Sequence, residues 1–127
     1  MDIRKLQKLA VTALEDIKAK DIEIINTSKI TAMFDRVIIA TGDSNRQVKS
    51  LAKSVHDKVK EAGGQVIGME GEETGEWVLV DLGDIVVHIM QPAVRTYYNL
   101  EELWKTVPKR TRKKAVDPDA EPEAAAD

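Results

Sequence analysis

An uninterrupted apolar run that leads directly into a helix start signal constrains the fold of this 127-residue chain most strongly. Residues 34–41 contain three consecutive aliphatic side chains, which is typical of a strand buried on both faces. Ser44 and Gln47 then have the spacing of a capping box, and an apolar stripe at helical intervals continues as far as a pair of glycines. A further strand candidate occupies residues 65–69. Strand, helix and strand in this order predict a right-handed crossover between parallel strands, as in α/β folds.

The remaining apolar patterns complete a single small domain. Residues 3–20 have the periodicity of a helix, preceded by an aspartate as N-cap, and residues 22–26 form a short strand candidate. Residues 76–82 and 85–90 flank a Gly-Asp connection, which is a hairpin signal, and short helices are expected after it. Hydrophobic residues make up 43% of the chain, which is enough for one core. We therefore expect one α/β domain over residues 1–107, with a mixed sheet of about five strands flanked by helices.

The charges of the chain are distributed unevenly. Residues 109–114 carry five basic side chains and residues 117–127 carry five acidic ones, so the two runs cancel. Residues 108–127 lack apolar periodicity, and we expect them to form a disordered charged tail. The other 14 basic and 17 acidic residues lie in residues 1–108 and give this part the net charge of −3. An acidic domain predicts little direct contact with nucleic acid, and a basic protein partner fits it better.

Several chemical classes have no support in the sequence. The chain has no cysteine, and its two histidines, His56 and His88, fall in different predicted elements, so no metal site and no cofactor are expected. No set of residues combines a nucleophile, a base and an orienting group, which argues against an enzyme. Apolar runs long enough for a membrane span or a signal peptide are missing from the sequence, so a cytoplasmic protein without membrane contact is expected.

The two-residue turn sets the register of the predicted hairpin. One face of the hairpin becomes wholly aliphatic and should belong to the core. The other face is mixed, and pairs Trp77 with Met90, Leu79 with His88, and Asp81 with Val86. Such a face is either covered by a helix or presented to a partner.

Aromatic residues gather in the last third of the domain. Four of the five aromatics of the chain are Trp77, Tyr97, Tyr98 and Trp104, and Arg95 lies among them in the sequence. Aromatic and methionine side chains are common at binding hot spots, but they also complete hydrophobic cores. Arg95 is expected to stack on a ring or pair with a carboxylate. The pattern alone leaves both core packing and a partner surface open.

A nucleotide-binding transferase is the main alternative function. The Gly42-Asp43-Ser44 turn connects a strand to a helix N-terminus, where free backbone N–H groups can bind phosphate, and Asp81 or Asp84 could hold a metal. However, one glycine is a weak signal, and Ser44 and Gln47 can occupy those N–H groups themselves. Asp81 and Asp84 also flank a hairpin tip, which is a poor arrangement for chelation. A third possibility is a homodimer that uses the mixed hairpin face on itself.

Three ordered motifs resemble the Iojap-like family of ribosomal silencing factors. Residues 35–48 (DRVIIATGDSNRQV) resemble the family signature D-x-x-V-I-x-x-G-x-S-x-R-Q-V. Residues 70–88 contain an E-G pair followed by GEWVLVDLGDIVVH, which resembles the block W-V-L-x-D-x-G-D-x-V-V-H. Residues 95–104 (RTYYNLEELW) resemble the closing R-x-x-Y-x-L-E-x-L-W. The resemblance covers roughly residues 3–105 and leaves the charged tail outside.

The resemblance implies both a fold and a partner. It implies a nucleotidyltransferase-like topology without transferase activity, and binding to the large ribosomal subunit through its ribosomal protein fourteen. Docking there would block joining of the small subunit and repress translation when nutrients are limiting. Together with the hairpin analysis, it makes these residues the candidates for partner binding: Trp77, Leu79, His88, Met90, Arg95 and Tyr98.

Overall fold

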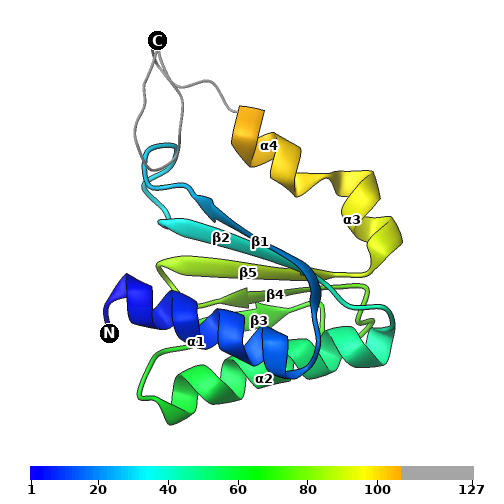
Figure 1. The fold of residues 1–127 in the computed structure, drawn as a ribbon, viewed down its shortest axis with the longest axis horizontal. Helices are drawn as coiled ribbons and strands as arrows, with labels where there is room; N and C mark the ends of the chain where they lie inside the picture. The colour runs from blue at the N-terminus through cyan, green and yellow to red at the C-terminus, as the bar shows by residue number, and fades with distance from the viewer. Residues whose placement is uncertain (107–127) are drawn as a thin grey trace.

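A computed structural model describes residues 1–106 of the chain as one sheet with helices on both sides (Figure 1). The elements are α1 (Ile3–Asp16), β1 (Lys20–Asn26), β2 (Arg36–Thr41), α2 (Asn45–Glu61), β3 (Gly68–Glu70), β4 (Trp77–Asp81), β5 (Ile85–Met90), α3 (Pro92–Tyr98) and α4 (Leu100–Thr106). The sheet order is β1-β2-β5-β4-β3, and only β2 and β5 pair in parallel. The predicted α/β class with a five-stranded mixed sheet is confirmed. The expected charged tail lies outside the described residues.

The predicted crossover spans more of the sheet than its sequence order suggests. Strand β2 runs parallel to β5, and β4 is antiparallel to both β5 and β3, so β3 has the same direction as β2. The two strands joined through α2 are nevertheless separated by β5 and β4. The neighbour of β2 is therefore β5, and the β4–β5 hairpin lies between β2 and β3 in the sheet.

Local signals define how the two long helices begin and end. The carboxylate of Asp2 accepts a hydrogen bond from the Lys5 backbone N–H at 2.9 Å, which confirms the N-cap of α1. The prediction that this helix reaches residue 20 is wrong, because it ends at Asp16 and Lys18 adopts a left-handed conformation with φ 63°. In α2, the Ser44 hydroxyl accepts from the Gln47 N–H at 3.1 Å, as a capping residue should.

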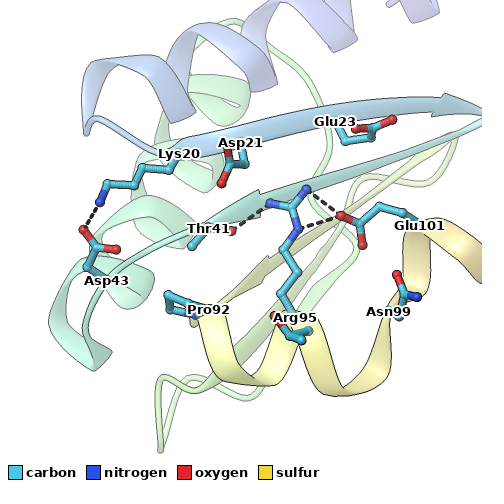
Figure 2. A pocket seen from close by; sticks show the side chains of 10 residues that line it. Lys20, Asp21, Glu23, Thr41, Asp43, Pro92, Arg95, Asn99 and Glu101 are labelled. Atoms are coloured by element: carbon cyan, nitrogen blue, oxygen red, sulfur yellow. Dashed lines mark hydrogen bonds and ion pairs between the residues drawn. The ribbon is translucent and has the colours of Figure 1, made fainter.

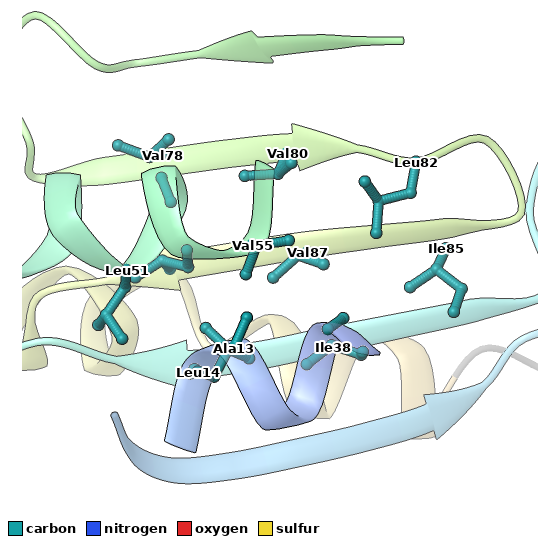
Figure 3. Close-up of a cluster of buried hydrophobic side chains, with 14 of the residues drawn as sticks. Ala13, Leu14, Ile38, Leu51, Val55, Val78, Val80, Leu82, Ile85 and Val87 are labelled. Atoms are coloured by element: carbon teal, nitrogen blue, oxygen red, sulfur yellow. The ribbon is translucent and has the colours of Figure 1, made fainter. Parts of the chain in front are cut away.

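The predicted hairpin register is confirmed at every described pair. Trp77 lies opposite Met90, Leu79 opposite His88, and Asp81 opposite Val86. The aliphatic face of the hairpin packs against α1 and α2 and forms the main core with β2 (Figure 3). This cluster, called the main core below, consists of aliphatic side chains such as Leu14, Ile38, Leu51, Val55, Val78, Val80 and Val87. The mixed face of the hairpin therefore lies on the side of the sheet where α3 and α4 are found (Figure 1).

Candidate partner-binding surface

The second face of the sheet is only partly covered. Four buried side chains lie at its centre: Ile25, Val37, Ile39 and Met90. We call them the second cluster, and partly buried side chains of α3, α4 and neighbouring segments pack against it: Phe34, Trp77, Val94, Leu100 and Trp104. Helix α3 itself contributes no buried residue. Two short helices therefore cover this face less completely than α1 and α2 cover the other.

A hydrogen bond joins the two polar aromatic side chains of the mixed hairpin face. The indole Nε1–H of Trp77 donates to Nδ1 of His88 at 3.0 Å, and the two ring centroids are 5.8 Å apart. Burial lowers the pKa of His88 from 6.5 to about 4, because the imidazolium would lose solvation. His88 is therefore neutral at physiological pH and can keep Nδ1 as an acceptor. Its Nε2–H is then a donor at the half-buried surface.

Tyrosine rings of α3 extend this aromatic group. The ring centroid of Tyr98 lies 4.8 Å from that of Trp77, and Tyr97 makes an edge contact with Tyr98 at 5.0 Å. Large apolar areas remain in contact with solvent, since Tyr97 is 81% exposed and Tyr98 is 53% exposed. Tyr97 is absent from the six residues predicted from sequence. The only sequence signal for it is its place in the aromatic group of the last third of the domain.

The structure brings four of the predicted residues together at the surface. We define the aromatic surface as the exposed or partly buried side chains of Trp77, Leu79, His88, Tyr97 and Tyr98. Leu79 and His88 are direct cross-strand neighbours, and Trp77 connects them to α3. A contiguous group of aromatic side chains that is only partly buried is typical of protein-binding surfaces.

Met90 does not belong to the accessible part of this surface. Its side chain is fully buried in the second cluster. The hairpin alternation places Met90 on the correct face of the sheet, but α3 and α4 fold over that end of β5. Met90 packs beside Trp77, its cross-strand neighbour, so the structure places this predicted partner-binding residue in the core and not at the surface.

Arg95 points inward, along an open hollow of about 720 Å³ between β1, the end of β2 and α3 (Figure 2). Its Nε and Nη2 atoms each lie 2.7 Å from Oε2 of Glu101, and Nη1 donates to the Thr41 hydroxyl at 2.7 Å. The predicted carboxylate partner of Arg95 is therefore Glu101. Elsewhere in the hollow, Lys20 and Asp43 form an exposed ion pair at 2.8 Å.

Side chains of the protein bond to backbone N–H groups at the Gly42–Ser44 turn. Gln47 accepts a hydrogen bond from the Asp43 N–H at 2.7 Å, one residue before the N-cap, and Ser44 accepts from the Gln47 N–H. A Cβ added to Gly42 would lie 2.9 Å from a methyl group of Val48. The glycine thus permits close packing of strand on helix, and the N–H groups of Gly42, Asp43 and Gln47 are bonded to atoms of the protein itself.

The two aspartates of the transferase alternative lie at the other end of β2. The Asp84 carbonyl accepts from the Arg36 N–H where β2 begins, whereas Gly42 follows the last residue of that strand. The carboxylate of Asp81 accepts from the Gly83 N–H at 2.9 Å and supports the hairpin turn. The parts of a transferase site are therefore separated by the length of the strand. Within residues 1–106, no group of three His, Cys, Asp or Glu side chains could hold a metal ion.

Comparisons with known proteins agree in pointing to one family. A family model described as "Ribosomal silencing factor during starvation" matches residues 1–127. The chain is 64% identical over 104 residues to a ribosomal silencing factor of Chromobacterium violaceum, covering 82% of this chain and 85% of that protein. It is 41% identical to the ribosomal silencing factor of Bacillus subtilis, covering 85% of this chain and 92% of that protein.

Solved structures give the same result at the level of the fold. A crystal structure from Chromobacterium violaceum superposes with a TM-score of 0.81 at 63% identity, covering 83% of this chain and 88% of that one. A structure from Bacillus halodurans gives a TM-score of 0.73 at 40% identity, covering 80% and 94% of the two chains. Among residues 1–106, no helix is long and apolar enough to cross a membrane. With its fold, its motifs and its relatives in agreement, the chain belongs to the RsfS family of ribosomal silencing factors.

Proposed function

We propose that this protein binds the large ribosomal subunit through the aromatic surface and contacts large-subunit ribosomal protein fourteen there. By occupying that site it would block joining of the small subunit sterically and repress translation when nutrients are scarce. The observation that carries the proposal is the group of exposed Tyr97 and Tyr98 with partly buried Trp77, on the incompletely covered face of the sheet. Membership of the ribosomal silencing factor family supplies the class of partner.

The chemistry of the surface fits a protein partner better than RNA. Partly buried aromatic rings supply large contact areas at low entropic cost, and neutral His88 can donate one hydrogen bond from Nε2. Residues 1–108 carry a net charge of −3, which favours a basic protein over a phosphate backbone. We infer that the protein acts stoichiometrically in the cytoplasm, without catalysis and with little direct contact to nucleic acid.

Tyr98 offers a cleaner test of this surface than Trp77. Trp77 packs against the second cluster and bonds to His88, so its truncation would weaken both binding and the fold. Tyr98 is half exposed, and Tyr98→Ala should lower the affinity for large subunits by about 2 kcal/mol or more, which is roughly 30-fold. Co-sedimentation with purified large and small subunits, over a range of protein concentrations, measures the change.

A matched control lies on the opposite face of the sheet. Ile24 is 41% exposed and pairs with Ile38, which belongs to the main core. Ile24→Thr removes exposed apolar area while keeping a β-branched residue in β1, and it should bind like the unmodified protein. Equal recovery with large and small subunits, lost at moderate salt, would indicate nonspecific charge attraction and contradict the proposal.

A further inference from the structure

We propose that Arg95 and Glu101 form an internal clamp that positions Tyr98 against Trp77, so that Arg95 orders the aromatic surface without touching the partner. This inference deepens the proposed function and rests on it for one of its two measurements.

Helix α3 needs this ion pair because its apolar contacts with the sheet are few. None of its seven residues is buried, and only Val94 packs against the second cluster. Its N-terminal end is held by the Gln91 N–H, which donates to the Glu76 carbonyl at 3.0 Å. Its C-terminal end passes into α4 through Asn99, which adopts a left-handed conformation with φ 50°. These contacts hold the two ends of α3. The rotation of α3 about its own axis depends instead on contacts of its side chains.

The guanidinium of Arg95 supplies the missing constraint. It joins three elements, because Arg95 belongs to α3, Thr41 ends β2 and Glu101 lies in the first turn of α4. The ion pair is well shielded, with the two side chains 12% and 21% exposed. A planar guanidinium with several donors in fixed directions restricts orientation more than a lysine could. Arg95 therefore holds the middle of α3 to the sheet and to α4.

The clamp and the aromatic surface share one turn of helix. Tyr98 follows Arg95 by three residues, so both side chains lie on the same side of α3. When Arg95 is held, Tyr98 is held at 4.8 Å from Trp77. If Arg95 is released, α3 can rotate or detach, and only the fraction of molecules with an ordered Tyr98 can bind.

Glu101 has no other cation to compensate it among the described contacts. Nε and Nη2 of Arg95 both bond to the same oxygen, Oε2, while Oε1 is buried without a hydrogen-bond partner within residues 1–106. Removing Arg95 would therefore leave a shielded carboxylate unpaired, and removing Glu101 would leave a shielded guanidinium held only by Thr41. Replacing both by apolar residues removes this conflict.

Arg95→Met, Glu101→Leu and the double variant test the clamp through two measurements. The first is hydrogen exchange of the backbone amides at positions 95 and 99, which are bonded within α3 and its caps. The second is the affinity for large subunits, measured by co-sedimentation. Each single variant should speed this exchange at least about tenfold and weaken binding to large subunits about tenfold, while amides of β2 and β5 stay protected. The double variant should recover most of both losses. Lys20→Met, which breaks the exposed ion pair of the same hollow, should change neither.

The outcomes separate the clamp from a contact role and from failure of the proposed function. Unchanged exchange in α3 of both single variants would overturn the clamp. A double variant with restored exchange but binding as weak as Arg95→Met would show that Arg95 touches the partner, which also overturns it. If the unmodified protein does not bind large subunits, the proposed function fails, whereas the exchange measurement still decides the clamp. Glu101→Gln, a milder change, replaces Glu101→Leu if that variant loses protection in β2 and β5.

Discussion

The two faces of the sheet are covered in different ways, and the difference separates stability from binding. On one face, α1 and α2 bury a continuous aliphatic core that includes Leu14, Leu51 and Val87. On the other, the short helices α3 and α4 enclose only the second cluster within residues 1–106, and aromatic rings remain exposed beside it. Burial of aliphatic area stabilises the fold, whereas exposed aromatic area is available to a partner. Substitutions on the two faces should therefore affect different measurements.

The largest effect on stability should come from the main core. Leu51 is fully buried on α2, and Leu51→Ala removes apolar contacts and leaves a cavity. We expect its free energy of unfolding to fall by about 3–4 kcal/mol, with affinity for large subunits unchanged while the variant stays folded. Urea denaturation measures the change. Tyr98→Ala is the opposing case and should cost under about 1 kcal/mol of stability, so an equal loss for both variants would contradict the division between the faces.

His88 should make stability on the second face depend on pH. Its folded pKa of about 4 lies below the ordinary value of 6.5, so the unfolded chain binds the proton more readily between these values. The free energy of unfolding should be independent of this group above pH 6.5. It should then fall by about 2–3 kcal/mol as the pH drops towards 4.

The contribution of His88 can be isolated with two glutamine variants. Denaturation at several pH values should show a flatter dependence for His88→Gln than for the unmodified protein, because carboxylates titrate in both. His56→Gln is the matched control, because it removes the other histidine of the sequence and leaves His88 in place, so it should keep the part of the dependence that comes from His88. The same slope in His88→Gln and the unmodified protein would show that burial of His88 has no such effect.

A smaller effect is expected where α2 begins, on the well-covered face. Ser44→Ala removes the N-cap bond to the Gln47 N–H and should cost about 1 kcal/mol of stability. Ser50→Ala makes the same change at an exposed position within α2 and is the matched control. Thermal denaturation compares the two variants.

Calorimetric titration with ATP or GTP and magnesium should show no saturable binding. Binding at micromolar nucleotide that Ser44→Ala abolishes would revive the transferase alternative.

The smallest effect should follow deletion of residues 109–127. This segment contains five basic and five acidic residues, so its removal leaves the net charge of the chain unchanged. We expect changes under about 0.5 kcal/mol in both stability and affinity for large subunits. Deleting only residues 117–127 leaves the basic run and serves as a comparison. A large loss of affinity in the longer deletion, with a weaker dependence on salt, would show that the basic run contacts ribosomal RNA.

Local sequence signals predicted the elements that depend on near neighbours. The two-residue turn set the pairing of Trp77 with Met90, since a change of one residue would move every aliphatic side chain off the core face. Asp2 and Ser44 were recognisable as caps because their bonds reach only three residues along the chain. The end of α1 was not recognisable, because Lys18 turns there in a conformation that its side chain does not signal.

The sequence by itself determined which residues share a face of the sheet, but only the tertiary structure decided which of them a partner could reach. Alternation along β4 and β5 put Trp77, Leu79, His88 and Met90 on one face, because successive side chains of a strand point to opposite sides. Burial of Met90 and exposure of Tyr98 depend instead on where α3 and α4 lie over that face. That placement is held by long-range contacts, among them the bond from Arg95 to Thr41 across 54 positions of the chain. The periodicity of the sequence cannot predict such a contact, because the contact depends on how distant segments meet when the chain folds.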